Sequence, residues 1–95
     1  MGPTIIALPP QLDGTSAASL QARLLAVRGR PVALDGARVT RLGALGLQVL
    51  LAGARTWAED ALDYALTDPS PALSQGLRQL GATLAMTAAP GADHP

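Results

Sequence analysis

Short apolar segments with strand character alternate with longer segments of helical periodicity along most of the chain. Residues 4–8 and 31–35 are β-rich and apolar, and residues 62–67 alternate with the period of two typical of a strand. Residues 15–27, 43–60 and 71–80 repeat apolar side chains three and four positions apart, which predicts amphipathic helices. This order of strand, helix, strand, helix, strand and helix predicts an α/β fold with a mostly parallel sheet and right-handed crossovers.

Capping residues mark the expected ends of the helices. Thr15 or Ser16 is the predicted N-cap of the first helix, because a hydroxyl accepts from the free N–H groups of a first turn. The third helix begins with Ser70 as N-cap and proline directly after it, where a missing N–H costs nothing. The strongest periodic signal is in the second helix, where we expect these side chains to face the core: Leu47, Leu50, Leu51, Ala54, Trp57 and Ala58.

The length of 95 residues is that of one domain. Hydrophobic residues make up 48% of the chain and aromatic residues only 2%, so the core must consist of Leu, Ala, Val and Ile. We expect residues 1–86 to form the domain, with a last short strand at 84–86. Residues 87–95 are rich in Ala, Pro, Gly and Asp, which predicts a disordered C-terminal tail.

The charge and residue content exclude several functional classes. The seven basic and seven acidic residues give a formal net charge of zero, and the basic residues are all arginines scattered along the chain. A nucleic-acid-binding surface is therefore not expected. There is no cysteine, and the single histidine, His94, lies in the predicted tail, so we expect no metal site and no cofactor. No nucleophile, base or metal set is recognisable, and the chain is predicted not to be an enzyme.

The same residues bear on location. No stretch reaches the ~18 apolar residues of a membrane span, and the N-terminal residues lack the basic segment of a signal peptide. The absence of cysteine fits a reducing compartment. We therefore expect a cytoplasmic protein without a membrane span.

The segment TRLGALGLQVLLAG, residues 40–53, opens the second helix with glycines and no reactive group. It matches neither the dinucleotide fingerprint nor a Walker loop, and it has no lysine. The N–H groups at a helix start attract anions, so a small ligand at this position stays an open alternative.

Three segments together resemble STAS domains, the small α/β modules of anti-sigma-factor antagonists. They are LPPQLDGTSAASLQARLLAVRG at residues 8–29, VALDGARVTRLGALGLQVLLAGARTWAEDAL at 32–62, and YALTDPSPALSQGLRQLGA at 64–82. The resemblance implies one mixed sheet with helices packed on one side and an antiparallel N-terminal strand. It also implies a non-enzymatic protein-interaction module whose second helix opens at an Asp-Ser-Ser-Gly-Leu loop, in which a partner kinase phosphorylates a hydroxyl.

This chain differs from that loop at the aspartate and at both serines. Aligning Gly46 and Leu47 with the family's Gly-Leu places Leu45 at the phosphorylated position, Ala44 at the preceding serine and Gly43 at the aspartate. Leu45 has no hydroxyl, so this phospho-site position is degenerate. The resemblance therefore implies docking on a partner without the usual Ser/Thr phosphoswitch.

Within the family, the chain is most similar to small STAS proteins that accompany bacterial chemotaxis operons. The features that carry this likeness are Leu12 and Asp13, the Leu-Gln-Val-Leu-Leu segment at 47–51, Trp57, and Asp-Pro-Ser-Pro-Ala-Leu at 68–73. They imply a chemotaxis histidine kinase or response regulator as partner in bacterial signal transduction. The expected partner-binding residues lie in two loops: Asp13, Thr15 and Ser16, and Arg41, Leu42, Gly43, Ala44, Leu45 and Gln48.

Two alternatives stay open within the family. One is an anti-sigma factor antagonist that binds a serine kinase or anti-sigma factor and is switched elsewhere, with Thr15, Ser16 and Thr40 as candidate hydroxyls. The other is the STAS subunit of a phospholipid-trafficking ABC transporter. Such subunits usually keep a threonine in this loop, and Leu45 counts against that assignment.

Overall fold

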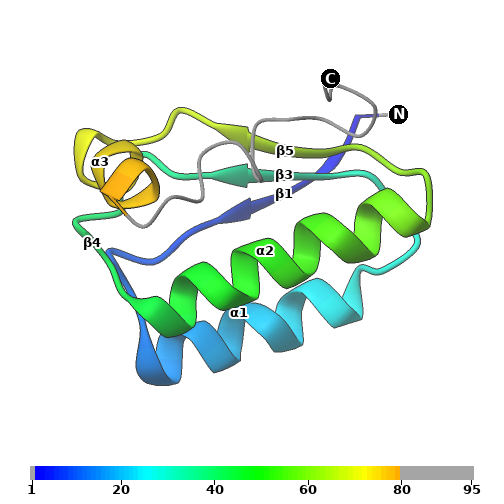
Figure 1. Ribbon diagram of the computed structural model, residues 1–95. Coiled ribbons are helices and arrows are strands. Elements are labelled where there is room, and N and C mark those ends of the chain that lie inside the picture. Colours follow the sequence, from blue (N-terminus) through cyan, green and yellow to red (C-terminus); the bar gives the residue numbers. More distant parts are fainter. Residues whose placement is uncertain (1, 80–95) are drawn as a thin grey trace.

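Three parallel strands form the main sheet of the computed structural model, which describes residues 2–79 (Figure 1). The strands are β1 (Thr4–Ala7), β3 (Val32–Asp35) and β5 (Tyr64–Thr67), in the order β1-β3-β5. The sequence prediction of three parallel strands is confirmed. The antiparallel N-terminal strand implied by the resemblance is wrong for this chain, because β1 pairs with β3 in parallel register.

Two parallel helices, α1 (Gly14–Ala26) and α2 (Ala44–Glu59), lie side by side on one face of this sheet (Figure 1). The third helix, α3 (Pro71–Gln79), lies beyond the carboxyl ends of the strands and contacts β4 (Arg41–Leu42). Ser70 caps α3 as predicted, since its hydroxyl accepts from the N–H of Leu73 at 3.0 Å. The α/β fold with helices packed on a mostly parallel sheet is thus confirmed.

Several predictions lie outside the described residues. These are the last residue of the third helix, the short strand at 84–86, the tail at 87–95 and His94 within it.

The structure contains a second, parallel β-ladder of only two residue pairs, which the sequence analysis did not predict. Strand β2 (Gln11–Leu12) runs parallel to β4, pairing Gln11 with Arg41 and Leu12 with Leu42. The Thr40 N–H and hydroxyl also donate to the Pro10 carbonyl, at 2.7 and 3.0 Å. This ladder joins the segment that enters α1 to the segment that enters α2.

The core consists of aliphatic side chains with one tryptophan, as the composition predicts. The side of α2 that faces it differs from the predicted stripe: Gly46, Leu50, Gly53 and Trp57 are buried. The predicted Leu47, Leu51 and Ala54 are half-buried, and the prediction for Ala58 is wrong because that residue is exposed. The difference arises from Gly46 and Gly53, because a search for apolar side chains does not count glycine. These two glycines allow neighbouring segments to pack closely against α2. The described core residues are Ile6, Leu8, Leu12, Leu20, Leu24, Val32, Leu34, Val39, Leu50, Trp57, Leu73 and Leu77.

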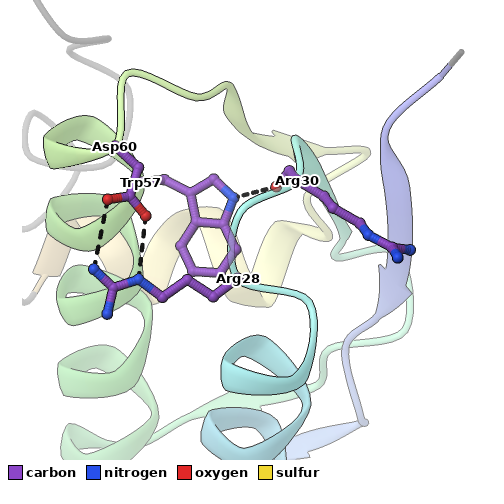
Figure 2. A network of polar contacts seen from close by, with 4 residues as sticks. All are labelled: Arg28, Arg30, Trp57 and Asp60. Carbon is purple, nitrogen blue, oxygen red and sulfur yellow. Dashed lines mark hydrogen bonds and ion pairs between the residues drawn. The ribbon is translucent and has the colours of Figure 1, made fainter.

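Polar contacts fasten the C-terminal end of α2 to the segment that follows α1 (Figure 2). The indole N–H of the buried Trp57 donates to the Arg30 carbonyl at 2.6 Å. Beside it, the Arg28 guanidinium pairs with the Asp60 carboxylate at 3.1 Å, a partly exposed ion pair of small energetic weight. The two helices are therefore held together at this end, and the opposite end carries the loops of interest.

Candidate functional site

The β2–β4 ladder brings together the two loops in which the sequence analysis placed the partner-binding residues. Residues 13–16 leave β2 and open α1, and residues 41–48 begin in β4 and open α2. Asp13 is the N-cap of α1 and Gly43 is the N-cap of α2. The starts of both helices consequently meet at the carboxyl-end edge of the sheet (Figure 1), which is where ligands and partners commonly bind open α/β sheets.

The first helix is capped by Asp13, so the predicted cap at Thr15 or Ser16 is wrong by two or three residues. Ser16 acts from the third helical position, where its hydroxyl oxygen accepts from the Asp13 N–H at 3.0 Å. The same hydroxyl lies within donating distance of the Gln11 and Asp13 carbonyls and donates to one of them. Ser16 is thus engaged in building the loop, while Thr15 is exposed beside it.

The glycines at the start of α2 allow β2 and the Asp13 loop to approach the helix closely. A Cβ at Gly46 would lie 2.1 Å from the Leu12 carbonyl oxygen, and a Cβ at Gly43 would lie 2.1 Å from a carboxylate oxygen of Asp13. The Asp13 carboxylate therefore lies at the N-terminus of α2, next to Gly43. Gly43 is the residue that the sequence analysis aligns with the family's aspartate. A negative charge at a helix N-terminus is stabilised by the exposed N–H groups of the first turn.

A polar hollow of about 680 Å³ opens between the two loops. Four of the predicted partner-binding residues line it together: Asp13, Thr15, Ser16 and Arg41. Its remaining lining is Pro9, Pro10, Gln11 and Gly14. The structure thus joins into one surface side chains that are up to 28 positions apart in the sequence.

A second, apolar depression adjoins this hollow, with Gly14 lining both. This α1–α2 groove, of about 410 Å³, runs between the outward sides of the two helices and includes the predicted Leu45 and Gln48. Leu45 lies in the first turn of α2 with 52% of its surface exposed. The groove also takes in residues that the sequence analysis did not single out: Ala18, Leu25, Val49 and Ala52.

The other predicted residues of the second loop lie apart from these two depressions. Leu42 is half-buried and packs toward α3, where a Cβ added at Gly76 would lie 3.2 Å from the Leu42 Cβ. Gly43 is half-buried under the Asp13 carboxylate, and Ala44 is exposed. Leu42 and Gly43 therefore shape the loop, and the exposed surface comes from Arg41, Leu45 and Gln48.

Two kinds of polar arrangement are absent from the described part of the chain. Residues 2–79 contain no group of three or more His, Cys, Asp or Glu side chains able to hold a metal ion. Within the same range, no polar or charged residue is buried. None of its helices is long and apolar enough to cross a membrane. What the two loops present is a surface with a polar hollow beside an apolar groove.

Comparison with known proteins gives one result that covers most of the chain. A family model described as "Mlab, STAS domain" matches residues 2–87. No curated protein matches the chain.

Proposed function

We propose that this chain, which belongs to the STAS domain family, is a non-enzymatic docking module of bacterial signal transduction that binds its partner through the paired helix starts. Family membership makes it a protein-interaction module of the general anti-sigma-antagonist type. The finer proposal is a cytoplasmic role in chemotaxis, with a histidine kinase or a response regulator as the partner. Its basis is the likeness of residues 47–51, Trp57 and residues 68–73 to STAS proteins of chemotaxis operons.

The observation that carries the docking proposal is the exposed Leu45 next to the polar hollow. A leucine with 52% of its surface exposed in the first turn of a helix gains about 1 kcal/mol when a partner covers the remainder. Arg41 is exposed at the rim of the hollow and is available to a partner carboxylate. An apolar contact surrounded by polar groups is the usual composition of a protein interface.

The docking proposed here needs no phosphorylation at the start of α2. Position 45 has no hydroxyl, and its neighbours Ala44 and Gly46 have none either. Without a hydroxyl to phosphorylate, this helix start keeps the unmodified surface that docking uses.

Affinity purification from the native host, with mass spectrometry of what is bound, tests the proposal. The wild-type chain is expected to retain a chemotaxis kinase or response regulator, and Leu45→Asp is expected to lose at least about 90% of it, equivalent to roughly 1.4 kcal/mol. Ile5→Asp is the matched control, because Ile5 is 70% exposed but lies on strand β1 and lines neither depression. Retention of every partner by Leu45→Asp would contradict the proposal.

The same experiment separates the alternatives within the family. Recovery of a serine kinase or an anti-sigma factor would support an antagonist role, and recovery of transporter subunits would support the ABC-transporter role. Incubation with a candidate serine kinase and ATP, followed by mass spectrometry, adds an independent reading. A phosphate on Thr15, Ser16 or Thr40 would show that the protein is switched after all.

A further inference from the structure

We propose that the α1–α2 groove receives an α-helix of the protein partner, which lies along the groove with an uncharged, apolar side against it. This inference rests on the docking function proposed above. It specifies which kind of partner segment is bound, and it extends the contact from the starts of the two helices along their outward sides.

Two exposed leucines lie at the two ends of the groove. Among the described residues, the exposed large hydrophobic side chains are those of Ile5, Leu25 and Leu45, and the last two line this groove. Leu45 lies in the first turn of α2 and Leu25 in the last turn of α1, and the two helices run parallel (Figure 1). Large apolar side chains gathered in one depression mark an interaction site, whereas scattered ones do not.

The groove is continuous with the docking surface at the helix starts. Leu45 and Gln48 belong to the predicted docking loop and also line the groove, and Gly14 lines both the groove and the polar hollow. A partner that covers Leu45 therefore meets the groove directly. Leu25 lies at the far end, outside both docking loops, so it reports on the groove alone.

The lining of the groove determines the charge of its occupant. None of the thirteen described residues that line it is charged, and its polar side chains are those of Gln21, Gln48 and Thr56. The exposed charged residues of α2, Arg55 and Glu59, lie outside the lining. Because burying an unpaired charge is costly, the segment that fills the groove must be uncharged along its buried side.

The two walls of the groove determine the conformation of a polypeptide occupant. Both walls are α-helices, so their backbone N–H and C=O groups are paired within each helix along most of its length. An extended segment in the groove would bury its own backbone groups without partners, which is costly. A helix satisfies these groups internally, and the occupant is therefore helical.

The spacing of the lining residues also fits a helical occupant. On α2 they recur three and four positions apart along the whole helix: Leu45, Gln48, Val49, Ala52, Gly53 and Thr56. Such rows of side chains are the surface into which the ridges of a neighbouring helix pack. The small residues Ala18, Ala52 and Gly53 lie in the middle of the lining and allow a third helix to approach closely.

The distance between the two leucines sets the minimum length of the partner helix. Because α1 begins at Gly14 and α2 at Ala44, Leu25 and Leu45 are offset by about 15 Å along the groove, at 1.5 Å per residue. A helix that contacts both leucines places these contacts about ten residues apart, or roughly three turns. We therefore expect an amphipathic partner helix with apolar residues on one side over at least about three turns.

Photo-cross-linking in the native host, with mass spectrometry of the digested product, tests the proposal. A photoreactive amino acid at position 25 is expected to cross-link to the same partner as one at position 45. The two attachment points are expected in one helical segment of that partner, about ten residues apart. Ala22 is the matched control position, because it is exposed on the same helix but does not line the groove, and it is expected to give no cross-link.

Matched substitutions measure what the groove contributes to binding of the recovered partner. Leu25→Asp and Ala52→Arg, both at exposed positions of the lining, are each expected to raise the dissociation constant at least about tenfold in isothermal titration calorimetry. Ala22→Asp and Ala58→Arg, at exposed positions of the same helices outside the lining, are expected to bind as the wild type does. Far-UV circular dichroism checks that each variant is folded.

The outcomes distinguish this inference from the docking proposal. If Leu45→Asp loses the partner while folded Leu25→Asp and Ala52→Arg keep it, docking at the helix starts is correct and the helix in the groove is wrong. If neither leucine substitution affects binding, both proposals are wrong. The helix is also wrong if position 25 gives no cross-link to the partner, if the two attachment points lie in different segments, or if the product at position 25 is a lipid or another small molecule.

Discussion

Replacement of Gly46 by alanine is expected to destabilise the protein, although alanine is the better helix former. The added Cβ would lie 2.1 Å from the Leu12 carbonyl oxygen and 2.8 Å from its carbon, whereas real Cβ atoms essentially never approach within 3.0 Å. The obstacle is backbone, so β2 and the start of α2 must separate by about 1 Å. The same carbonyl accepts from the Gly43 N–H at 3.1 Å, and this hydrogen bond is weakened by the separation.

The magnitudes favour destabilisation. Overpacking costs about 1–3 kcal/mol, and the weakened hydrogen bond adds about 0.5–1.5 kcal/mol. The gain in helix propensity is at most about 1 kcal/mol. A net loss of about 1–3 kcal/mol follows, equivalent to a fall of several degrees in Tm at about 4–8 °C per kcal/mol for a chain of this size.

Urea unfolding followed by far-UV circular dichroism measures this loss as a lower midpoint at an unchanged slope. Ala52→Gly, at an exposed position of the same helix, is the control, because it reports propensity alone and is expected to cost about 1 kcal/mol. A Gly46→Ala variant as stable as the wild type would refute the close approach of β2 to α2. The joining of the two loops would then be in doubt.

Three further substitutions test other parts of the structure. Trp57→Phe is expected to cost about 1–3 kcal/mol in urea unfolding, because the Arg30 carbonyl loses its donor; an unchanged midpoint would contradict the contact in Figure 2. Burial raises the pKa of Tyr64 above its usual value of 10.0, so the unfolded chain loses this proton at lower pH than the folded one does. The contribution of Tyr64 to the free energy of unfolding is therefore complete below about pH 10 and is lost as the pH rises further. Tyr64→Phe is expected to lack this pH dependence. That variant also loses the hydrogen bond to the Leu50 carbonyl, and this loss is the same at every pH. Ser16→Ala is expected to cost about 0.5–2 kcal/mol through the first turn of α1, whereas the exposed Thr15→Ala is expected to change little.

The alternating order of elements was predictable because hydrophobic periodicity is a local property. The period of two around Tyr64 and Leu66 and the helical period of residues 43–60 are readable without knowledge of the tertiary contacts. The β2–β4 ladder was not predictable in this way. Two residue pairs are too short to produce a period, and their register depends on contacts between segments 30 positions apart.

The inward side of α2 was misjudged because close packing there depends on missing side chains. Gly46 and Gly53 are buried where the Leu12 carbonyl and the Tyr64 ring approach the helix. A pattern search that rewards large apolar residues assigns such positions to solvent. It thereby rotates the predicted stripe toward Leu47 and Ala58.

The candidate site was predictable in its residues but not in its shape. Asp13, Arg41 and Leu45 follow from the family resemblance, yet their division between a polar hollow and an apolar groove depends on how α1 packs beside α2. Leu25 illustrates the limit. It is one apolar residue off the predicted inward face of α1, and only the packing of α1 beside α2 places it in the same groove as Leu45.

Site-specific photo-cross-linking in the native host tests the central claim most directly. A photoreactive amino acid at position 45, in the first turn of α2, is expected to cross-link to a different protein, namely a chemotaxis kinase or response regulator. The same group at position 5, on the exposed strand surface, is expected to give no such product. If position 45 yields no cross-link to another protein while position 5 does, the paired helix starts are not the docking surface.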